Sequence, residues 1–360
     1  MKSQSKGKVF VGLSGGVDSS VSAALLQEAG YDVTGVFIRG WYPDWMECSW
    51  RDDRLDAMRV AVKLGIPFLT LNLEKEYKKE VVDYMIAEYR AGRTPNPDIM
   101  CNKHVKFGAY LTWALAQGAD YVATGHYSQV LKNTRIDGYD LVAGRDKSKD
   151  QSYFLWTLTR EQLSHTLFPI GHMQKSEVRK LAKKYDLPTA DKGDSQGVCF
   201  MGEVDVAEFL SRYIPKKRGD VLDESGRVIG HHDGAVYLTL GVRHGFTVTE
   251  KTPDDKPYYI ISRNTKKNTI TVSHRAPDGT LSSEKKEFSL SSTHWIGDAP
   301  ESGKRYMARV RHLGELMPCM VELVNGEEAE IGFGKPLTIA RGQSVVVYDG
   351  DICLGGGIVA

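Results

Sequence analysis

The alternation of apolar, β-rich runs with helix-like segments over residues 8 to about 125 constrains the fold more than any other feature of this sequence. Predicted strands occupy residues 8–13, 32–38, 68–73 and 120–124. Predicted helices occupy residues 20–29, 51–64, 74–90 and 106–117. This rhythm favours an α/β doubly wound, mostly parallel sheet with helices on both faces. Ligands of such sheets bind at the carboxyl ends of the strands.

The rest of the chain predicts two smaller units. Residues 130–200 extend the first domain with helices at 160–167 and 175–185. After about residue 205, short strands punctuated by glycine are expected at 235–240, 258–262 and 269–273. Further strands are expected at 305–312, 320–323, 337–340 and 344–348. Short strands at close spacing predict a small barrel. We therefore expect a catalytic domain at 1–204, a small central α+β domain at 205–283 and a C-terminal β-barrel at 284–360.

Composition excludes several classes of protein. The 360 residues are 41% hydrophobic and 26% charged, which is typical of a globular protein with two or three domains. The net charge of +1 means that any surface for nucleic acid must be local. Five cysteines without a close CxxC pair favour reduced thiols over a disulfide framework or a zinc ribbon. Because no stretch has the length of a signal core or a membrane span, we expect a cytoplasmic protein without membrane contact.

The segment SGGVDS at residues 14–19 directly follows a predicted strand and directly precedes a predicted helix. Its two glycines permit tight turns that direct amide groups toward an anion, and the helix N-terminus adds positive potential. Asp18 is unusual beside phosphates and suggests a bridging Mg²⁺. The alternative is a plain Ser/Gly turn with an aspartate cap. Neither G-x-x-x-x-G-K-[ST] nor a helix-opening G-x-G-x-x-G occurs, so the loop differs from kinase-like and dinucleotide-binding loops.

A second group of reactive residues lies in GRTPNPDIMCNK at residues 92–103. The two prolines delay a helix until near Asp98, which is a plausible N-cap. Cys101 then falls in the first helical turn, where the helix N-terminus lowers the pKa of a thiol. The alternative for such a cysteine is a small buried hydrophobe.

A second cysteine, Cys199, ends the loop DKGDSQGVCF at residues 191–200. Loops that follow parallel strands converge at one edge of the sheet, so Cys101 and Cys199 could meet there. Such a pair has a chemical use, because a persulfide on one cysteine delivers sulfur to an activated carbon and the other thiol resolves the chain as a disulfide.

These motifs resemble those of known enzymes. SGGVDS resembles the loop of the ATP pyrophosphatases, which cleave ATP to AMP and pyrophosphate and adenylate a carbonyl oxygen. GRTPNPDIMCNK together with KGDSQGVCF resembles the tRNA-specific 2-thiouridylase family. The same family resemblance extends to ATGHY at 123–127, GRDKSKDQSYFLW at 144–156, FPIGHMQKSEVRKLA at 168–182 and RHG at 243–245.

The resemblance implies replacement of O2 of a wobble uridine in tRNA by sulfur, with ATP and Mg²⁺ as cofactors. It implies that ATP is held by Gly12, Leu13, Ser14, Gly15, Gly16, Val17, Asp18, Ser19, Ile38 and Gly125, with Ile38 against the adenine. The implied partners are the anticodon stem-loop of tRNA and an upstream persulfide sulfur-donor protein.

The resemblance also assigns catalytic and substrate-binding roles. Asp98 would be the general acid/base, Cys101 the nucleophile and Cys199 the persulfide carrier. The extruded target base would be contacted by Asn96, Pro97 and Asp98. Further contacts to tRNA would come from Lys149, Asp150, Gln151, Arg311 and His312.

Alternation in the predicted strand 305–312 gives partial independent support for a tRNA contact. It places Arg305, Arg309 and Arg311 on one face. The opposite face carries Tyr306, Ala308 and Val310. Such a strand suits a barrel wall against phosphates, although a merely solubilising surface gives the same pattern.

Two other functions and one other cofactor fit parts of the sequence. An ATP-dependent ligase of a small metabolite explains the loop and the sheet, but gives no task to the cysteines or the barrel. A non-catalytic tRNA-binding protein conflicts with the retention of Asp18, Asp98 and both cysteines. An iron–sulfur cluster is a minor alternative, because the spacing of Cys101 and Cys199 matches no common cluster motif.

Overall fold

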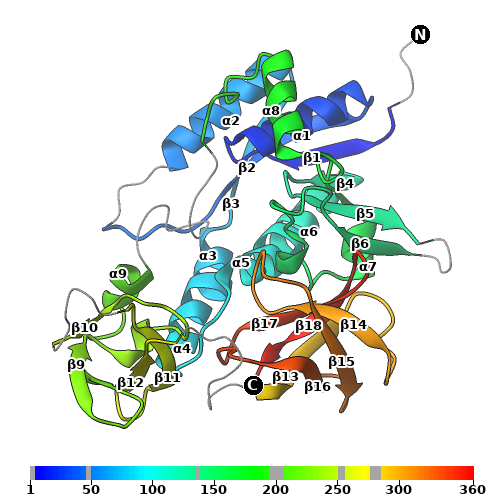
Figure 1. The fold of residues 1–360 in the computed structure, drawn as a ribbon. Coiled ribbons are helices and arrows are strands. Elements are labelled where there is room, and N and C mark those ends of the chain that lie inside the picture. Colours follow the sequence, from blue (N-terminus) through cyan, green and yellow to red (C-terminus); the bar gives the residue numbers. More distant parts are fainter. Residues whose placement is uncertain (1–4, 46–49, 134–137, 194–205, 250–255, 276–284) are drawn as a thin grey trace.

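The computed structural model describes residues 5–45, 50–133, 138–193, 206–249, 256–275 and 285–360 (Figure 1). These residues form a parallel α/β domain, a small central domain and a C-terminal antiparallel β-barrel, which confirms the expected fold class. Within the described ranges, no helix is long and apolar enough to cross a membrane.

The first domain contains a five-stranded sheet in the order β3-β2-β1-β4-β7. Its strands are β1 (Lys8–Gly12), β2 (Asp32–Arg39), β3 (Phe68–Asn72), β4 (Tyr121–Ala123) and β7 (Thr166–Leu167). Every neighbouring pair is parallel. The strand order reverses at β1, so the crevice that binds ligands in such sheets lies beyond the carboxyl end of this strand.

Helices cover both faces of this sheet (Figure 1). One face carries α1 (Val17–Glu28), α2 (Trp50–Leu64) and α8 (Lys175–Lys184). The other face carries two long helices with π-helical middles, formed by α3 (Glu74–Tyr77), η1 (Lys78–Asp83) and α4 (Tyr84–Arg90), and by α5 (Pro97–Met100), η2 (Cys101–Tyr110) and α6 (Leu111–Ala116). The second helix begins at Pro97, which agrees with the start predicted near Asp98 and extends the segment predicted at 106–117.

The barrel is built from more than the C-terminal segment. Its own strands are β13 (Lys285–Trp295), β14 (Arg305–Arg309), β15 (Met317–Leu323), β16 (Ala329–Leu337), β17 (Ser344–Asp349) and β18 (Ile352–Val359). Pairing of β13 with β18 closes the barrel. The hairpin of β5 (Ser128–Lys132) and β6 (Tyr139–Ala143) leaves the first domain and pairs with β18. One continuous sheet therefore joins the two domains.

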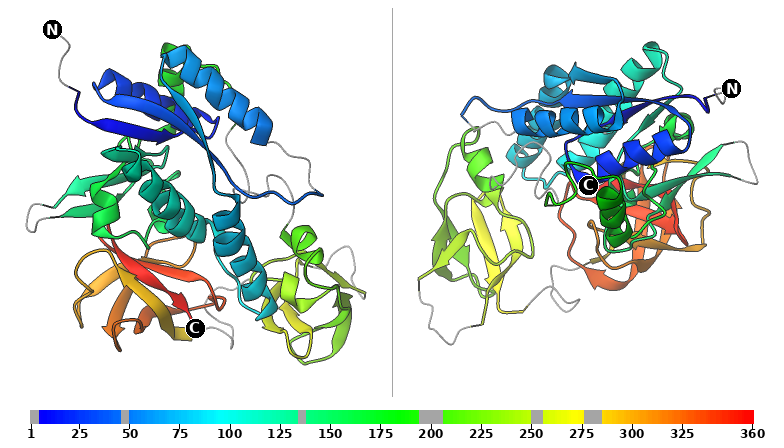
Figure 2. Two further views of the ribbon diagram at one scale, coloured as in Figure 1. Left: turned by 180° about the vertical axis from the view of Figure 1, so that it is seen from behind. Right: turned by 90° about the horizontal axis from the view of Figure 1, so that it is seen from above.

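The central domain packs on α4 through α9 (Val206–Ser211) and the 3-10 turn η4 (Ala235–Tyr237) (Figure 2). Its sheet has the order β10-β9-β8-β12-β11. The strands are β8 (Gly219–Leu222), β9 (Val228–His232), β10 (Phe246–Val248), β11 (Tyr259–Asn264) and β12 (Thr269–Ser273). The Arg263 guanidinium donates to the Gly92 carbonyl at 2.7 Å and ties this domain to the first.

Some predicted elements are wrong in type or extent. The strand predicted at 235–240 is a 3-10 turn, because Ala235 and Leu238 turn into the core of the central domain. The strand predicted at 337–340 lies almost wholly after β16. The helix predicted at 160–167 is α7 (Arg160–Ser164) followed by edge strand β7. A further 3-10 turn, η3 (Ser152–Phe154), precedes it.

Candidate active site

The SGGVDS segment leaves the carboxyl end of β1 and enters α1, which begins at Val17 with Gly16 as its N-cap. Because glycine has no side chain, the amide groups of the first turn have no side-chain cap at this end. Gly15 has φ +76°, and a Cβ there would lie 2.3 Å from the Asp53 carbonyl oxygen. Glycine is therefore required at this position both by conformation and by space.

Hydroxyl groups fold the loop onto itself. The Ser14 amide donates to Ser19 Oγ at 3.2 Å, and the two hydroxyl oxygens lie 3.2 Å apart. Ser19 Oγ donates to the Gly16 carbonyl at 3.2 Å. Ser14 is exposed, so the folded loop presents its outer side to solvent.

Asp18, in the first turn of α1, has partners that the sequence did not reveal. Lys175 Nζ lies 2.8 Å from each of its carboxylate oxygens. The Tyr127 hydroxyl donates to Asp18 Oδ1 at 2.8 Å. Both partners lie in motifs that the family resemblance includes, Tyr127 in ATGHY and Lys175 in FPIGHMQKSEVRKLA, but the resemblance predicts no role for either. Their distance along the chain hid this contact.

The turn formed by ATGHY, residues 123–127, packs against the N-terminal turn of α1. A Cβ at Gly125 would lie 2.7 Å from the Ser19 amide nitrogen and 2.8 Å from the Asp18 carbonyl carbon. Gly125 thus reaches the loop, although its contact with a nucleotide stays a prediction. The neighbouring His126 is buried, and this burial, with the nearby Lys106 charge, holds its pKa well below the usual value.

The segment that carries Cys101 is capped by Asn96 and not by Asp98. Asn96 Oδ1 accepts hydrogen bonds from the amides of Asp98 at 3.2 Å and Ile99 at 3.3 Å. Pro97 takes the first helical position, where its missing N–H and fixed φ are suited to a helix start. Cys101 therefore lies in the second turn, where its side chain is buried.

The helix of Cys101 runs antiparallel to β1. Near the helix C-terminus, the Gln117 carbonyl accepts from Lys8 Nζ at 3.1 Å, at the amino end of the strand. Further back, the Tyr110 hydroxyl donates to the Phe10 carbonyl at 2.8 Å, in the middle of the strand. Cys101 precedes Tyr110 in this helix, so it lies toward the carboxyl end of β1, the end at which the SGGVDS loop begins.

Cys199 lies outside the described residues, as does most of the loop at 191–200. The described residues that precede it, including Lys192, lie beside the SGGVDS loop. Lys192 Nζ binds Asp53 Oδ1 at 2.9 Å and Asp56 Oδ2 at 2.8 Å, and Asp53 is the residue whose carbonyl abuts Gly15. The meeting of the two cysteines stays a prediction.

The predicted adenine contact, Ile38, lies at the end of β2 and packs partly buried against the main core. The predicted cofactor residues 12–19 and Ile38 therefore share the carboxyl edge of the sheet. For metals, the described ranges contain no group of three or more His, Cys, Asp or Glu side chains that could hold an ion. An iron–sulfur cluster, the alternative cofactor, would need Cys199 as a ligand, and Cys199 lies outside these ranges.

The predicted tRNA-contacting run 149–151 has internal partners. Asp150 is fully buried and pairs with Arg309 Nη1 of β14 at 2.5 Å. Its Oδ1 accepts from the amides of Gly144 and Ser152 at 3.0 Å. A direct contact of this carboxylate with tRNA would require the ion pair to open.

Gln151 Oε1 accepts from the Tyr127 amide at 3.0 Å, so this side chain is also engaged within the protein. Lys149, between Asp150 and the exposed Ser148, is partly exposed. Lys149 and Gln151 are both partly exposed, whereas Asp150 is buried. All three contacts with tRNA stay predictions.

The prediction that Arg309 lies on an exposed cationic face with Arg305 and Arg311 is wrong. Arg305 and Arg311 are exposed and Tyr306 and Ala308 are buried, as alternation predicts. Arg309 is buried because Asp150 of the first domain neutralises its charge at the interface. The strand also ends there, so Arg311 follows β14.

His312 packs between the barrel and the first domain. Its ring lies 4.2 Å from that of Phe154, centroid to centroid, and burial is the main cause that lowers the pKa of His312. The Phe154 carbonyl accepts from Asn102 Nδ2 at 3.3 Å, next to Cys101 in the chain. His312 is thus linked to the cysteine-bearing helix, whereas its predicted contact with tRNA is untested.

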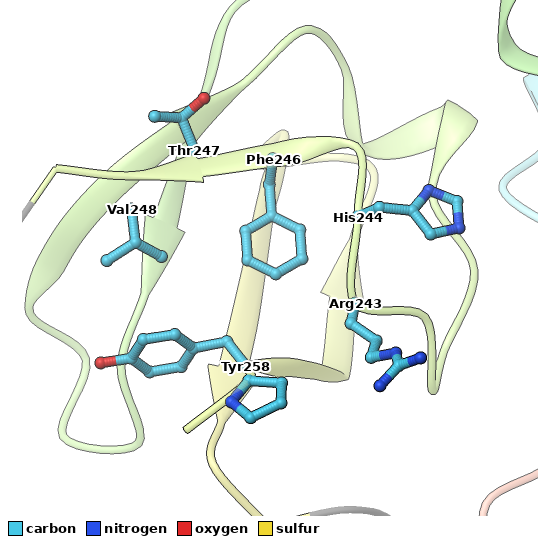
Figure 3. A pocket seen from close by; sticks show the side chains of 7 residues that line it. Arg243, His244, Phe246, Thr247, Val248 and Tyr258 are labelled. Carbon is cyan, nitrogen blue, oxygen red and sulfur yellow. The ribbon is translucent and has the colours of Figure 1, made fainter. Parts of the chain in front are cut away.

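Arg243 and His244 of the RHG motif line an open hollow of about 400 Å³ in the central domain (Figure 3). Arg243 and His244 stand on one side of it, and the rings of Phe246 and Tyr258 lie on the other. The Tyr258 ring also stacks on His274 at 3.8 Å between centroids.

Comparison with known proteins identifies the family. The models described as "tRNA methyl transferase HUP domain", "tRNA methyl transferase PRC-barrel domain" and "Aminomethyltransferase beta-barrel domain" match residues 7–203, 207–274 and 285–359. A tRNA-specific 2-thiouridylase MnmA of Streptococcus thermophilus is 44% identical, over 100% of this chain and 96% of the relative. This chain belongs to the tRNA-specific 2-thiouridylase family. Another such thiouridylase, from Methylobacillus flagellatus, is 43% identical over 98% of this chain and 99% of its own length.

Solved structures resemble this family member more distantly. A 4-thiouridine synthetase–RNA complex with bound ATP has a TM-score of 0.34 and 22% identity, over 58% of this chain and 50% of that chain. The U34-tRNA thiolase NcsA of Methanococcus maripaludis has a TM-score of 0.36 and 17% identity, over 59% of this chain and 68% of that chain.

The domain boundaries at 204 and 283 stay predictions, because residues 194–205 and 276–284 lie outside the described ranges.

Proposed function

We propose that this thiouridylase uses ATP to replace O2 of the wobble uridine of tRNA with sulfur. One observation carries the proposal. The SGGVDS loop begins at the carboxyl end of β1, and Cys101, near the start of a different helix, lies toward the same end of this strand. A small-metabolite ligase would use the loop alone. Membership in the thiouridylase family favours tRNA as the substrate.

ATP would bind along Gly12–Ser19, with its pyrophosphate at the start of α1 and its adenine against Ile38. Helix N-termini and glycine-rich turns bind phosphates through amide groups. Mg²⁺ prefers oxygen ligands and usually joins one or two carboxylates to substrate phosphates. Asp18 would supply such a carboxylate and would share its two oxygens with Lys175, whose Nζ lies 2.8 Å from both. When bound, Mg²⁺ would neutralise phosphate charge. Uracil O2 would then attack the α-phosphorus, and pyrophosphate would leave.

The second half-reaction would use the residues at 96–101 and Cys199. Asn96, Pro97 and Asp98 would hold the extruded base, and Asp98 would accept the N3 proton as O2 is adenylated. The terminal sulfur of a Cys199 persulfide would attack C2 and displace AMP. Cys101 would attack Cys199 Sγ, which leaves the outer sulfur on uridine and forms a disulfide. An upstream persulfide donor and an external thiol reductant would complete the cycle.

The exposed Arg311 and the partly exposed Lys149 would contact the phosphates of the anticodon stem-loop, with the barrel as a wall of the binding surface. Asp150, Gln151 and His312 would act there by shaping this surface, because their side chains have partners within the protein. A tRNA substrate and reactive thiols fit a cytoplasmic enzyme.

Mass spectrometry of nucleosides from tRNA tests the proposal. The full chain, with ATP and a persulfide donor, should form 2-thiouridine, whereas Cys101→Ala and Cys199→Ala should not. Both variants should bind ATP and tRNA as the wild type does, and Cys319→Ala in the barrel core serves as the matched cysteine control. Wild-type activity in either catalytic variant contradicts the two-cysteine mechanism. ATP–pyrophosphate exchange that needs no tRNA favours the small-metabolite ligase.

A further inference from the structure

The phosphate loop of this chain lacks the lysine that P-loop enzymes carry at its end. In G-x-x-x-x-G-K-[ST], that lysine reaches the β- and γ-phosphates as a point charge. SGGVDS continues instead into Ser20 and Val21. The structure brings a lysine to the loop from 157 positions further along the chain, because Lys175 Nζ lies 2.8 Å from both carboxylate oxygens of Asp18.

Lys175 occupies a position that its own helix does not favour. It is the first residue of α8, after the N-cap Gln174, and the positive end of a helix dipole disfavours a cation there. Its side chain is only 14% exposed, so it has also lost much of its hydration. The contacts with Asp18 offset these costs. A lysine at this place is explained by the loop that it faces and not by the stability of α8.

Contacts on several sides hold Lys175 in position. Its backbone amide donates to Asp146 Oδ2 at 2.9 Å, and this hydrogen bond is the first cause that lowers the pKa of Asp146. Its ammonium lies 5.7 Å from the centroid of the Tyr127 ring, whose hydroxyl binds Asp18. These contacts therefore fix the ammonium at the start of α1.

We infer that Lys175 binds the β- and γ-phosphates of ATP and stabilises the pyrophosphate as the bond between the α-phosphorus and its bridging oxygen breaks. Asp18 and Tyr127 hold the ammonium in place for this task. A triphosphate beside Asp18 would otherwise face a like charge, and Lys175 offsets it. The inference rests on the proposed ATP-dependent function and adds the group that recognises the leaving pyrophosphate.

Calorimetric titration of the full chain with ATP, AMP and inorganic pyrophosphate tests this role. Lys175→Met should weaken the binding of ATP and of pyrophosphate by roughly tenfold to a hundredfold, the usual range for lost charge-assisted contacts. AMP lacks the two outer phosphates, so its affinity should change less than about twofold. Lys175→Arg should recover part of the affinity for ATP. Lys180→Met, an exposed lysine of the same helix, is the control and should bind all three ligands as the wild type does.

The three ligands separate a phosphate contact from a structural role. Equal loss of ATP and AMP binding in both Lys175 variants would show that Lys175 only supports the fold, and unchanged ATP binding in Lys175→Met would overturn the inference directly. If the wild type itself bound neither ATP nor AMP, the proposed ATP-dependent function would fail with it. Thermal unfolding of each variant shows whether its fold is intact, and Lys175→Arg keeps the charge if Lys175→Met unfolds.

Discussion

Single residues of the phosphate loop show how far sequence reasoning reaches. The sequence was sufficient to predict the order of strand, Gly-Gly turn and helix at residues 8–29, whereas the binding of an anion by the amide groups of residues 14–19 stays a prediction. The sequence could not show why glycine is needed at each position, because the reason is contact with distant segments. Gly15 packs against the backbone of Asp53 in α2, and Gly125, in the turn after β4, packs against the backbone of Ser19. Lys175 was missed for the same reason, since a contact across 157 positions leaves no local pattern.

The cap of the cysteine-bearing helix gives a prediction at this scale. Asn96→Ala should lower the free energy of unfolding by about 0.5–2 kcal/mol, because the amides of Asp98 and Ile99 lose their acceptor. Asn96→Asp should keep that stability, since aspartate caps as well as asparagine does. If Asn96 also touches the target base, Asn96→Asp should still reduce thiolation at least several-fold.

Urea unfolding and nucleoside mass spectrometry on the same preparations separate these two roles of Asn96. Equal stability of Asn96→Ala and wild type would contradict the cap. Normal thiolation by Asn96→Asp would remove Asn96 from the proposed base contacts and leave it a structural role alone.

At the scale of elements, hydrophobic alternation predicted which strand residues are buried but not which charges are. Tyr306 and Ala308 face the barrel core as their spacing indicates. Arg309 breaks the pattern because its partner, Asp150, belongs to the first domain. A pattern within one strand carries no information about a charge that arrives from a different domain.

The Asp150–Arg309 pair should therefore behave as an interdomain contact with strong coupling. Removing one partner leaves a buried charge uncompensated, so Arg309→Met and Asp150→Asn should each cost about 3 to 5 kcal/mol of unfolding free energy. The double variant should cost less than the sum of the two. Arg305→Met, on the exposed face of the same strand, is the control and should change stability by less than about 0.5 kcal/mol.

A double-mutant cycle from urea unfolding measures this coupling. Additive losses in the double variant would mean that the two side chains act independently despite their contact. Separate transitions for the barrel and the first domain in either single variant would show instead that the pair links the unfolding of the two domains.

At the scale of the whole molecule, the order of the three domains could be predicted, but their connection could not. The change from helix-rich to glycine-punctuated, strand-rich sequence indicated an α/β domain, a small central domain and a barrel. Residues 130–200 are predicted as an extension of the first domain, and no strand is predicted where β5 and β6 form a hairpin. Its pairing with β18 arises from Ile352 and Cys353, near the C-terminus, and depends on a register that no local sequence pattern specifies.

Buried histidines in two different domains give the molecule a stability that depends on pH. Burial is the main cause that lowers the pKa of His126 in the first domain and of His232 in the central domain. A histidine with a depressed folded-state pKa binds fewer protons folded than unfolded. Stability should therefore be full above the unfolded value of about 6.5 and should decline as pH falls below it.

The expected loss between pH 7.5 and 5.5 is on the order of 1 kcal/mol from His126 alone, provided that its folded pKa stays below this window. Carboxylates with lowered pKa values, such as Asp146, add their loss only as pH falls through about 4, below the histidine window. Urea unfolding at a series of pH values should thus show a first decline that His126→Gln makes shallower. His172→Gln, at an exposed histidine, serves as the control for the substitution itself. A flat profile between pH 7.5 and 5.5 in the wild type would mean that His126 takes up its proton without unfolding, which its burial beside Lys106 argues against.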